Sequence, residues 1–461
     1  MPSRPRLHDR VVVRRHLRAG KDELALFDSE RERVLVLDAR AWWVIGEADG
    51  TRDLPGIISS ARRRGATWSD AQIQELFDEL GREGLLADGT PSGFLGGEVT
   101  LPHRDDHREI VVMPGASYHC DGRGSCCRSY ATIAFIPADV HRACATAPTR
   151  CNAGDDPSRV FLPLTGSAPS TIRAVTLADG SCAFLDADGA CGLHRVGGSE
   201  NKPVGCRWFP TQLVDDGTEI RASPAIECAC PARPDERGAP LLPAHVRTAA
   251  DLPAGIVIGR VWERVRVVDD VDADRADALA VLDAFGSAID GRDLARAMWS
   301  WSLALLQHKA LVPHTDDRDA PAIEPIAAWA RMIAARASAR AEAEALWRGE
   351  RNLVCDRLRT IAAAAGVLGS PIAARALVEM AAPDPALEAH VVRSAVFGRA
   401  WLERGPLASR LAELALQLWI ARALPAFLSE AADTTLREVP LAALLGAWRT
   451  CGLSRALETP R

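Results

Sequence analysis

The sequence predicts an α+β protein built from several domains. Short β-type runs and amphipathic helical segments lie near the N-terminus, ten of the twelve cysteines fall within about 110 central residues, and Ala-, Leu- and Arg-rich runs of helix length fill the remainder. A chain of 461 residues is long enough for about two to four domains. We therefore predict a small winged-helix-like domain over 1–92, an irregular, metal-bound, cysteine-rich domain over 93–240 and an all-α domain over 241–461.

The N-terminal domain is predicted to begin with strands. Apolar runs at 11–13, 24–27 and 34–37 are typical of short strands, and the polar residues 28–31 predict a hairpin turn. Three short helices are expected to follow. Asp38 can cap the first of them, and Ser69 with Gln72 forms a capping box for the third.

This segment resembles the PqqD-like peptide-recognition domains of maturation systems for ribosomally made peptides. The residues that carry the resemblance are 34–38, the pair Asp49-Gly50, and the apolar positions from Ile73 to Leu86. The resemblance implies that a leader-like peptide adds as a strand against the hairpin and lies on the third helix. A scaffold wing that packs on the next domain is the alternative.

The central region is rich in Gly, Pro, Asp and Cys and has few long apolar periods. Such a segment buries little apolar surface, and in that circumstance metal ligation supplies folding free energy. Because the N-terminus lacks the apolar core of an export signal, densely spaced thiols favour metal binding over disulfides. The candidate metal ligands are Cys120, Cys126, Cys127, Cys182, Cys191, Cys206, Cys228 and Cys230.

The spacing of these cysteines predicts two local structures. Cys120 to Cys127 enclose a glycine-containing loop, in which positive φ angles let backbone amides turn toward sulfur. Cys182 and Cys191 flank a predicted hairpin whose Asp188-Gly189 turn brings the two cysteines near one another.

The order of these pieces resembles the cysteine-cluster family described as zinc- or iron-chelating (YkgJ-like), which includes the flagellin lysine N-methylases. The family pattern is a C-x-x-C-G-x-C-C opening, a C-x-F-L hairpin ending in C-x-I/L-H/Y, and a K/R-P-x-x-C-R-x-F/Y-P segment. Residues 120–127, 182–194 and 202–210 match these pieces. The resemblance implies a bound metal and, by analogy alone, lysine N-methylation with S-adenosylmethionine as the methyl donor.

One departure affects the expected ligand set. Arg123 stands where many members carry the second opening cysteine, so the set either loses a thiolate or is completed by Cys144, Cys151, Cys228 or Cys230. Structural zinc favours C-x-x-C knuckles, which this chain lacks, whereas iron-sulfur clusters tolerate irregular spacing. An iron-sulfur cluster is therefore favoured over zinc, and both alternatives stay open.

The remainder of the chain predicts an α-helical domain. The isolated Cys355 and Cys451 are interpreted as small buried hydrophobic residues. The acidic run 269–274 lacks the glycine and glutamate of a calcium loop and is interpreted as solvated residues at a helix N-terminus. The helix-length runs are 272–287, 292–309, 321–348, 351–366, 370–382, 386–403 and 407–429.

Charge and hydropathy exclude some classes of function. A net charge of −6 with both signs interspersed gives no general attraction to nucleic acid, and acidic residues on the third predicted helix argue against a DNA-binding role. The most apolar late segment, 411–428, is interrupted by Glu413 and Arg422, so no membrane span is expected. We expect a cytoplasmic protein.

These observations predict a metalloprotein that takes part in modifying a peptide or protein bound through its N-terminal domain. Whether it is an enzyme stays open. The chain has no glycine-rich nucleotide loop, hydrolase elbow, zinc-protease motif or radical S-adenosylmethionine motif, and its catalytic residues are unknown. The alternative is a non-catalytic, zinc-stapled adaptor. A redox-active cluster near a pocket favours the enzyme, and closed tetrahedral zinc favours the adaptor.

Overall fold

The protein is described by a computed structural model. The residues that it describes are 2–18, 21–28, 30–89, 99–100, 103, 105–118, 120, 124–130, 133–151, 160–163, 173–175, 177–178, 180–226, 228, 238–253, 255–314, 321–349, 352–399, 401–402, 405–428 and 440–453.

These residues form two compact units. Unit 1 comprises 1–96, 130–207 and 342–352, and unit 2 comprises 97–129, 208–341 and 353–461. The chain mixes helices and strands, as an α+β protein does. The range 1–92 lies wholly within unit 1, whereas residues of the range 93–240 belong to both units.

The N-terminal part of unit 1 has the elements that the sequence predicts. Asp38 caps the first helical turn through the amide of Arg40, and Ser69 and Gln72 form the expected capping box. The elements are β1 (Pro5–Leu7), β2 (Val11–Arg18), β3 (Lys21–Asp28), β4 (Arg33–Asp38), η1 (Ala39–Ala41), α1 (Trp42–Ile45), α2 (Leu54–Arg63), α3 (Asp70–Arg82) and β5 (Leu86–Asp88).

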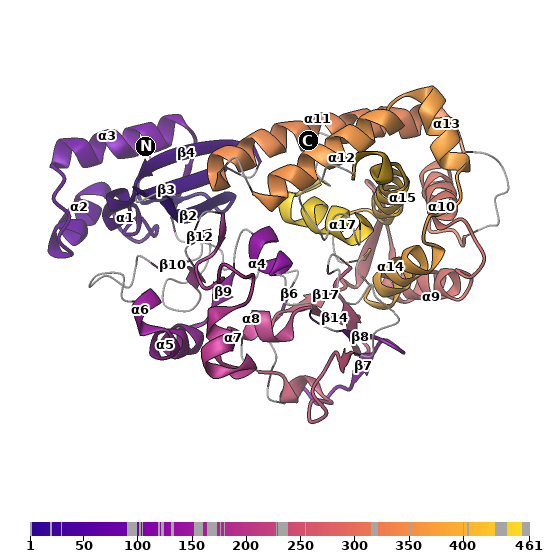
Figure 1. The fold of residues 1–461 in the computed structure, drawn as a ribbon, viewed down its shortest axis with the longest axis horizontal. Coiled ribbons are helices and arrows are strands. Elements are labelled where there is room, and N and C mark those ends of the chain that lie inside the picture. Colours follow the sequence, from indigo (N-terminus) through magenta and orange to yellow (C-terminus); the bar gives the residue numbers. More distant parts are fainter. Residues whose placement is uncertain are drawn as a thin grey trace. The chain divides into compact units, whose positions relative to one another are not determined.

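Strands β2, β3 and β4 form an antiparallel sheet with a core on each face. Figure 1 shows α1, α2 and α3 gathered beside these strands, and apolar side chains such as Leu24 and Leu26 pack in one cluster with Ile73 and Phe77 of α3. The opposite face carries Phe27, which packs with Trp347 from residues 342–352 of the same unit.

The remaining elements of unit 1 are short. They are β9 (Ala134–Phe135), α5 (Pro137–Thr146), α6 (Pro148–Cys151), β10 (Phe161–Pro163), β11 (Arg173–Val175), β12 (Leu177–Ala178), β13 (Ser181–Cys182), α7 (Gly192–Gly197), η3 (Ser199–Asn201) and α8 (Val204–Trp208). Strand β12 extends the N-terminal sheet, because Leu177 pairs in parallel with His16 of β2. The sheet order is β13-β12-β2-β3-β4. The cysteine-rich region is thus more regular than predicted.

Unit 2 joins a second five-stranded sheet to a set of helices. Its elements are β6 (Val99–Thr100), β7 (Ile110–Val112), β8 (Ser117–Tyr118), α4 (Ser125–Ser129), β14 (Thr211–Asp215), β15 (Ile220–Pro224), β16 (Ala239–Pro240), η4 (Ala249–Asp251), β17 (Ile258–Arg260), β18 (Arg264–Val268), β19 (Val271–Asp274), α9 (Arg275–Gly286), α10 (Leu294–His308), α11 (Ile323–Arg348), α12 (Leu353–Leu368), α13 (Pro371–Glu379), α14 (Pro385–Phe397), α15 (Leu407–Ala423), η5 (Leu424–Phe427) and α17 (Pro440–Cys451). Residues 342–348 of α11 belong to unit 1.

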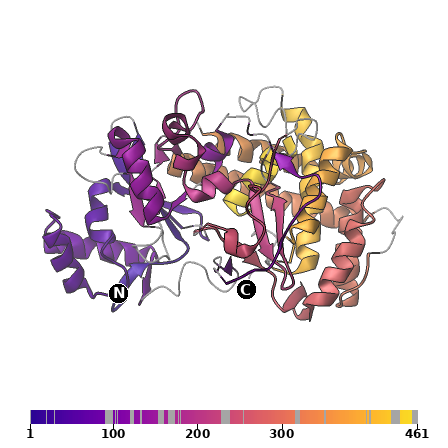
Figure 2. The same ribbon diagram turned by 90° about the horizontal axis from the view of Figure 1, so that it is seen from below.

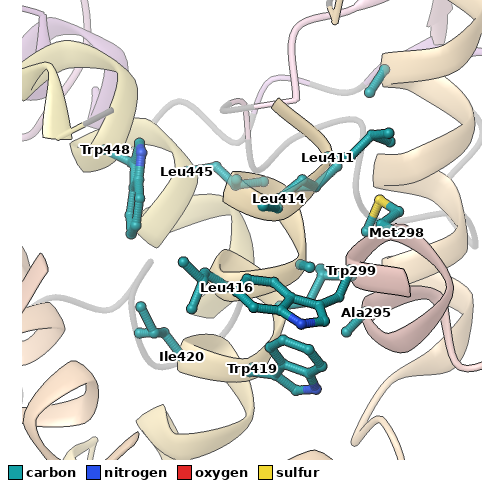
Figure 3. Packing of buried hydrophobic residues seen from close by; sticks show 14 of the residues in the cluster. Ala295, Met298, Trp299, Leu411, Leu414, Leu416, Trp419, Ile420, Leu445 and Trp448 are labelled. Carbon is teal, nitrogen blue, oxygen red and sulfur yellow. The ribbon is translucent and has the colours of Figure 1, made fainter. Parts of the chain in front are cut away.

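Helices α10, α15 and α17 supply much of the core of unit 2. Figure 3 shows Trp299 of α10 beside Trp419 of α15, and their ring centroids are 5.7 Å apart. Leu445 and Trp448 of α17 belong to the same buried cluster. Figure 2 shows β14 and β15 of the five-stranded sheet of unit 2, in magenta, beside these helices. Val214 of β14 packs in the same buried cluster.

The seven helices predicted between 272 and 429 are confirmed to within a few residues. The prediction that the whole range 241–461 is helical is wrong at its start, because β17, β18 and β19 occupy 258–274. Cys355 and Cys451 are buried, as expected. Among the described residues, no single helix has the length and apolar composition needed to cross a membrane, although α12 and α13 meet both requirements as a pair bent by 97°.

Candidate functional site

The first cysteine group lies in unit 2. Helix α4 carries Cys126, which is exposed, and Cys127, which is half-buried, while Cys120 is exposed. Gly124 has φ +67°, which agrees with the predicted glycine-containing loop. Arg123, which stands at a usual cysteine position, lies outside the described residues.

A buried arginine anchors this cysteine helix. The guanidinium of Arg357 on α12 donates to the Ser129 hydroxyl at 2.9 Å and to the Ser125 hydroxyl at 3.0 Å. Arg357 is 2% exposed. The two serines bracket Cys126 and Cys127, so one fork-shaped side chain fixes both ends of the short helix. Sequence reasoning missed Arg357, although its position on the apolar face of α12 is a usable signal.

Cys228 belongs to unit 2 as well. It is buried, and its amide donates to the carbonyl of Ala225 at 3.0 Å just beyond strand β15. Cys230, the other member of the predicted pair, lies outside the described residues.

The predicted hairpin between Cys182 and Cys191 is present in unit 1, but the two cysteines do not pair with each other across it. The turn lies at Asp188-Gly189 as expected, with Gly189 at φ +88°. The pairing places Cys191 opposite Leu185 and Cys182 opposite Leu177. A second turn, in which the amide of Leu185 donates to the carbonyl of Cys182 at 2.9 Å, causes this shift.

Aromatic packing and an ion pair hold this hairpin in place. Phe184 lies between the two cysteines in the chain and packs with Phe135 and Phe161, at centroid distances of 5.9 and 6.1 Å. Arg150 of α6 pairs with Asp186 of the hairpin. The hairpin is thereby fixed to α6, whose last residue is Cys151.

Cys206 lies on α8, which is attached to α5. The amide of Val204 donates to a carboxylate oxygen of Asp139 on α5 at 3.0 Å. Asp139 is 1% exposed and also pairs with Arg142. A buried carboxylate on α5 therefore sets the position of the helix that carries Cys206.

Cys144 and Cys151 come together on α5 and α6. Burial, together with a hydrogen bond and electrostatic interaction with the Cys144 thiol, raises the pKa of Cys151 to about 12. Neither residue is among the eight candidate ligands, although the sequence names both as residues that could complete the set in place of the cysteine missing at Arg123.

The eight candidate ligands do not share one unit. Cys182, Cys191 and Cys206 belong to unit 1, and Cys120, Cys126, Cys127 and Cys228 belong to unit 2. No three His, Cys, Asp or Glu side chains among the described residues lie in positions that could hold a metal ion. In the same part of the chain, no cysteine is in a disulfide bond. The described residues therefore do not fit a complete zinc or iron-sulfur site.

A second candidate site is the edge of the N-terminal sheet. Strand β4 is the last strand of its sheet, and in the described part of the chain no strand pairs with its outer side. Leu35 and Leu37 pack toward the core that contains α3, whereas Val36 points to the other face and is 46% exposed. This combination is typical of a surface that accepts an added strand.

Comparisons of the chain with protein-family models, with curated proteins and with solved structures found no match.

Proposed function

We propose that this protein captures an extended peptide along strand β4 and holds a metal with its cysteine-rich segments, as the PqqD-like and YkgJ-like resemblances imply. In this proposal the N-terminal part of unit 1 is a winged-helix-like domain, with β2 to β4 as the wing. The terminal position of β4 beside α3 is the observation that supports peptide capture best.

The two faces of β4 offer different surroundings to an added strand. Side chains alternate between the faces of a sheet, so a bound peptide would send every second residue toward the α3 side and the others toward the Val36 side. The main-chain groups of β4 would supply affinity, and the side chains of each face would supply selectivity.

The charge of α3 favours basic residues in the peptide. Asp70, Glu75 and Asp78 are exposed on this helix, and Glu79 is half-buried. Asp70 already pairs with Arg62 at 2.7 Å, so Glu75, Asp78 and Glu79 carry the acidic charge that a basic peptide would meet. An extended peptide with alternating apolar and basic residues is therefore the occupant that we propose.

The substitution Val36→Lys should weaken peptide capture about tenfold, equivalent to about 1.4 kcal/mol. A lysine in the middle of an edge strand places a hydrated charge where an incoming strand must pack. Binding is measured by fluorescence anisotropy with peptides enriched from a displayed random library on the full chain.

Val257→Lys is the matched control, because Val257 is 40% exposed and lies in unit 2. It should leave peptide affinity unchanged. Bound peptide should also slow hydrogen exchange of the β4 amides. Enriched peptides that bind the Val36→Lys protein as tightly as the parent would refute capture at β4.

The metal proposal rests on the cysteine pattern. Cys206 and the Cys182–Cys191 hairpin supply thiolates in unit 1, and Cys126, Cys127 and Cys228 supply them in unit 2. A complete metal site needs further ligands. Cys230, one of the eight proposed ligands, could supply one of them. Thiolates bind both zinc and iron-sulfur clusters, so the donor chemistry admits either group.

Metal and acid-labile sulfide should be found in protein purified without oxygen, and Cys206→Ser should lose most of the bound metal. Cys355→Ser is the control, because Cys355 is buried in unit 2 and its thiol donates a hydrogen bond to the carbonyl of Ala341. It should keep the full metal content. Equal metal content in Cys206→Ser and the parent would remove Cys206 from the ligand set, and absence of metal in the parent would refute the metal proposal.

The nature of the metal distinguishes two activities. Iron with sulfide would direct the search to a peptide-modifying enzyme, for which lysine N-methylation is the analogy and S-adenosylmethionine the donor to test. Stoichiometric zinc without sulfide would favour a non-catalytic adaptor in which the metal stabilises the fold.

A further inference from the structure

A segment far along the chain covers the second face of the N-terminal sheet. Residues 342–348, the last two turns of α11, belong to unit 1 together with β2, β3 and β4. Ala343 and Trp347 of this segment are buried in one cluster with Phe27 of β3, and Val34 of β4 packs on that cluster. The end of α11 therefore lies on the sheet face opposite the one that packs on α3.

The direction of each side chain around α11 follows from helix geometry. Successive side chains are turned by about 100°, so Arg348 and Leu346 project from opposite sides of Trp347. Arg348 is on the side of β12 and β13, because a Cβ placed on Gly180, in the turn between these strands, would lie 3.3 Å from the Cβ of Arg348. The sheet order is β13-β12-β2-β3-β4. Leu346 therefore projects toward the β4 side of the sheet.

Two apolar side chains on this side of the sheet are open to solvent. Leu346 is 66% exposed, and Val36 of β4 is 46% exposed. Val36 pairs with Ala25 of β3, which is buried in the cluster that contains Ala343. A helix is about 10–12 Å wide and neighbouring strands are about 4.8 Å apart, so a helix over β3 ends near β4. A strand added to β4 would lie next to Leu346.

We propose that Leu346 and Val36 form an apolar subsite for one side chain of the peptide captured along β4, so that Leu346 determines which peptides bind. This inference rests on the proposed peptide capture and adds selectivity to it. Peptide residues on one face meet the carboxylates of α3, such as Glu75 and Asp78, whereas residues on the other face meet Val36 and Leu346. The occupant is an extended peptide with basic side chains on the first face and apolar side chains on the second.

The substitution Leu346→Lys should weaken the binding of peptides enriched on the full chain about tenfold, because an ammonium group replaces an apolar side chain that the peptide covers. Affinity is measured by fluorescence anisotropy. Val196→Lys is the matched control, since Val196 is 67% exposed in the last turn of α7, which packs on α5 and η3. A cation is favourable in the last turn of a helix, so both variants should melt at the temperature of the parent.

A change of selectivity separates this role from a structural one. Serine replaces the apolar residues of an enriched peptide one at a time. At one position, serine should weaken binding to the parent and to Val196→Lys about tenfold, but binding to Leu346→Lys less than about threefold. A new selection on Leu346→Lys should enrich acidic residues at that position and keep the basic residues on the other face.

A photoreactive peptide tests the contact on the unmodified chain. A diazirine analogue of leucine at the sensitive position should cross-link to the tryptic peptide 341–348, which cleavage after Arg340 and Arg348 releases. Cross-links only to other segments would overturn the inference. So would peptides that Val36→Lys weakens but that bind Leu346→Lys as tightly as Val196→Lys, and in that case peptide capture would stand.

Two other outcomes assign the surface differently. If no peptide is enriched, or if enriched peptides bind Val36→Lys as tightly as the parent, peptide capture fails and this inference fails with it. Sedimentation of the peptide-free chain tests for a second copy at the same surface. A dimer that Leu346→Lys separates into monomers would assign Leu346 to self-association and overturn the proposal.

Discussion

Replacing Trp347 with alanine should lower the free energy of unfolding of unit 1 by about 3–5 kcal/mol. Trp347 is 1% exposed and stacks on Phe27 of β3, with ring centroids 5.1 Å apart. The guanidiniums of Arg14 and Arg348 lie 5.4 and 5.1 Å from the same ring. The substitution thus removes a large apolar contact and the aromatic ring that two buried cations contact.

Chemical denaturation followed by circular dichroism measures this loss, and hydrogen exchange should locate it in β2 and β3. Trp262→Ala is the matched control, since Trp262 also has an arginine over its ring, at 5.7 Å, and is 40% exposed. Its effect should stay within about 0.5 kcal/mol. A Trp347→Ala protein as stable as this control would show that packing on the second face of the sheet contributes little to the free energy of unfolding of unit 1.

The substitution Arg422→Met should destabilise unit 2 by about 3–5 kcal/mol, because it leaves the buried carboxylate of Glu388 and the half-buried one of Asp293 without their cation. The Arg422 guanidinium donates to Glu388 at 3.0 and 3.1 Å, to Asp293 at 3.0 and 3.3 Å, and to the carbonyl of Met380 at 3.0 Å. Arg422 is 3% exposed. One side chain thereby joins the start of α10 to α14 and α15.

The loss should depend on pH. Burial raises the pKa of Glu388 above its ordinary value even though Arg422 lowers it, so removing Arg422 raises this pKa further. The native state then holds an extra proton between the unfolded and folded pKa values, and stability falls as pH rises through that window. The deficit of Arg422→Met should therefore be smaller near pH 4 than at pH 7.

Urea denaturation at both pH values measures this difference. Arg264→Met is the control, because Arg264 forms an exposed pair with Asp274, which typically contributes less than about 1 kcal/mol. A deficit for Arg422→Met that is equal at the two pH values would contradict the assignment of the loss to ionised Glu388.

Local chemistry explains which elements could be predicted from the sequence. The capping box at Ser69, the cap at Asp38 and the Asp188-Gly189 turn all depend on residues close in the chain, and all three are present. Helix α17 was not predicted because residues 440–451 are apolar on nearly every side. They therefore lack the alternation of apolar and polar residues that marks an amphipathic helix. In the acidic run, Asp274 does precede helix α9, but Val271–Asp274 forms strand β19.

Long-range pairing explains what the sequence did not reveal. Strand β12 has two residues and joins β2 through a single pair, Leu177 with His16, which no local pattern encodes. The division of the cysteines between two units likewise depends on chain topology, because spacing alone does not distinguish them. Arg357, which holds the Cys126 and Cys127 helix, lies more than two hundred residues from it in the chain.

The cover on the second face of the N-terminal sheet has a consequence for synthesis on the ribosome. Trp347 follows its stacking partner Phe27 by 320 residues in the chain. At a translation rate of about 5–20 residues per second, Trp347 is synthesised on the order of 15–60 s after Phe27. During this interval the nascent chain exposes Phe27 and Arg14 to solvent, so we expect it to present an apolar surface for chaperones that is buried in the finished protein.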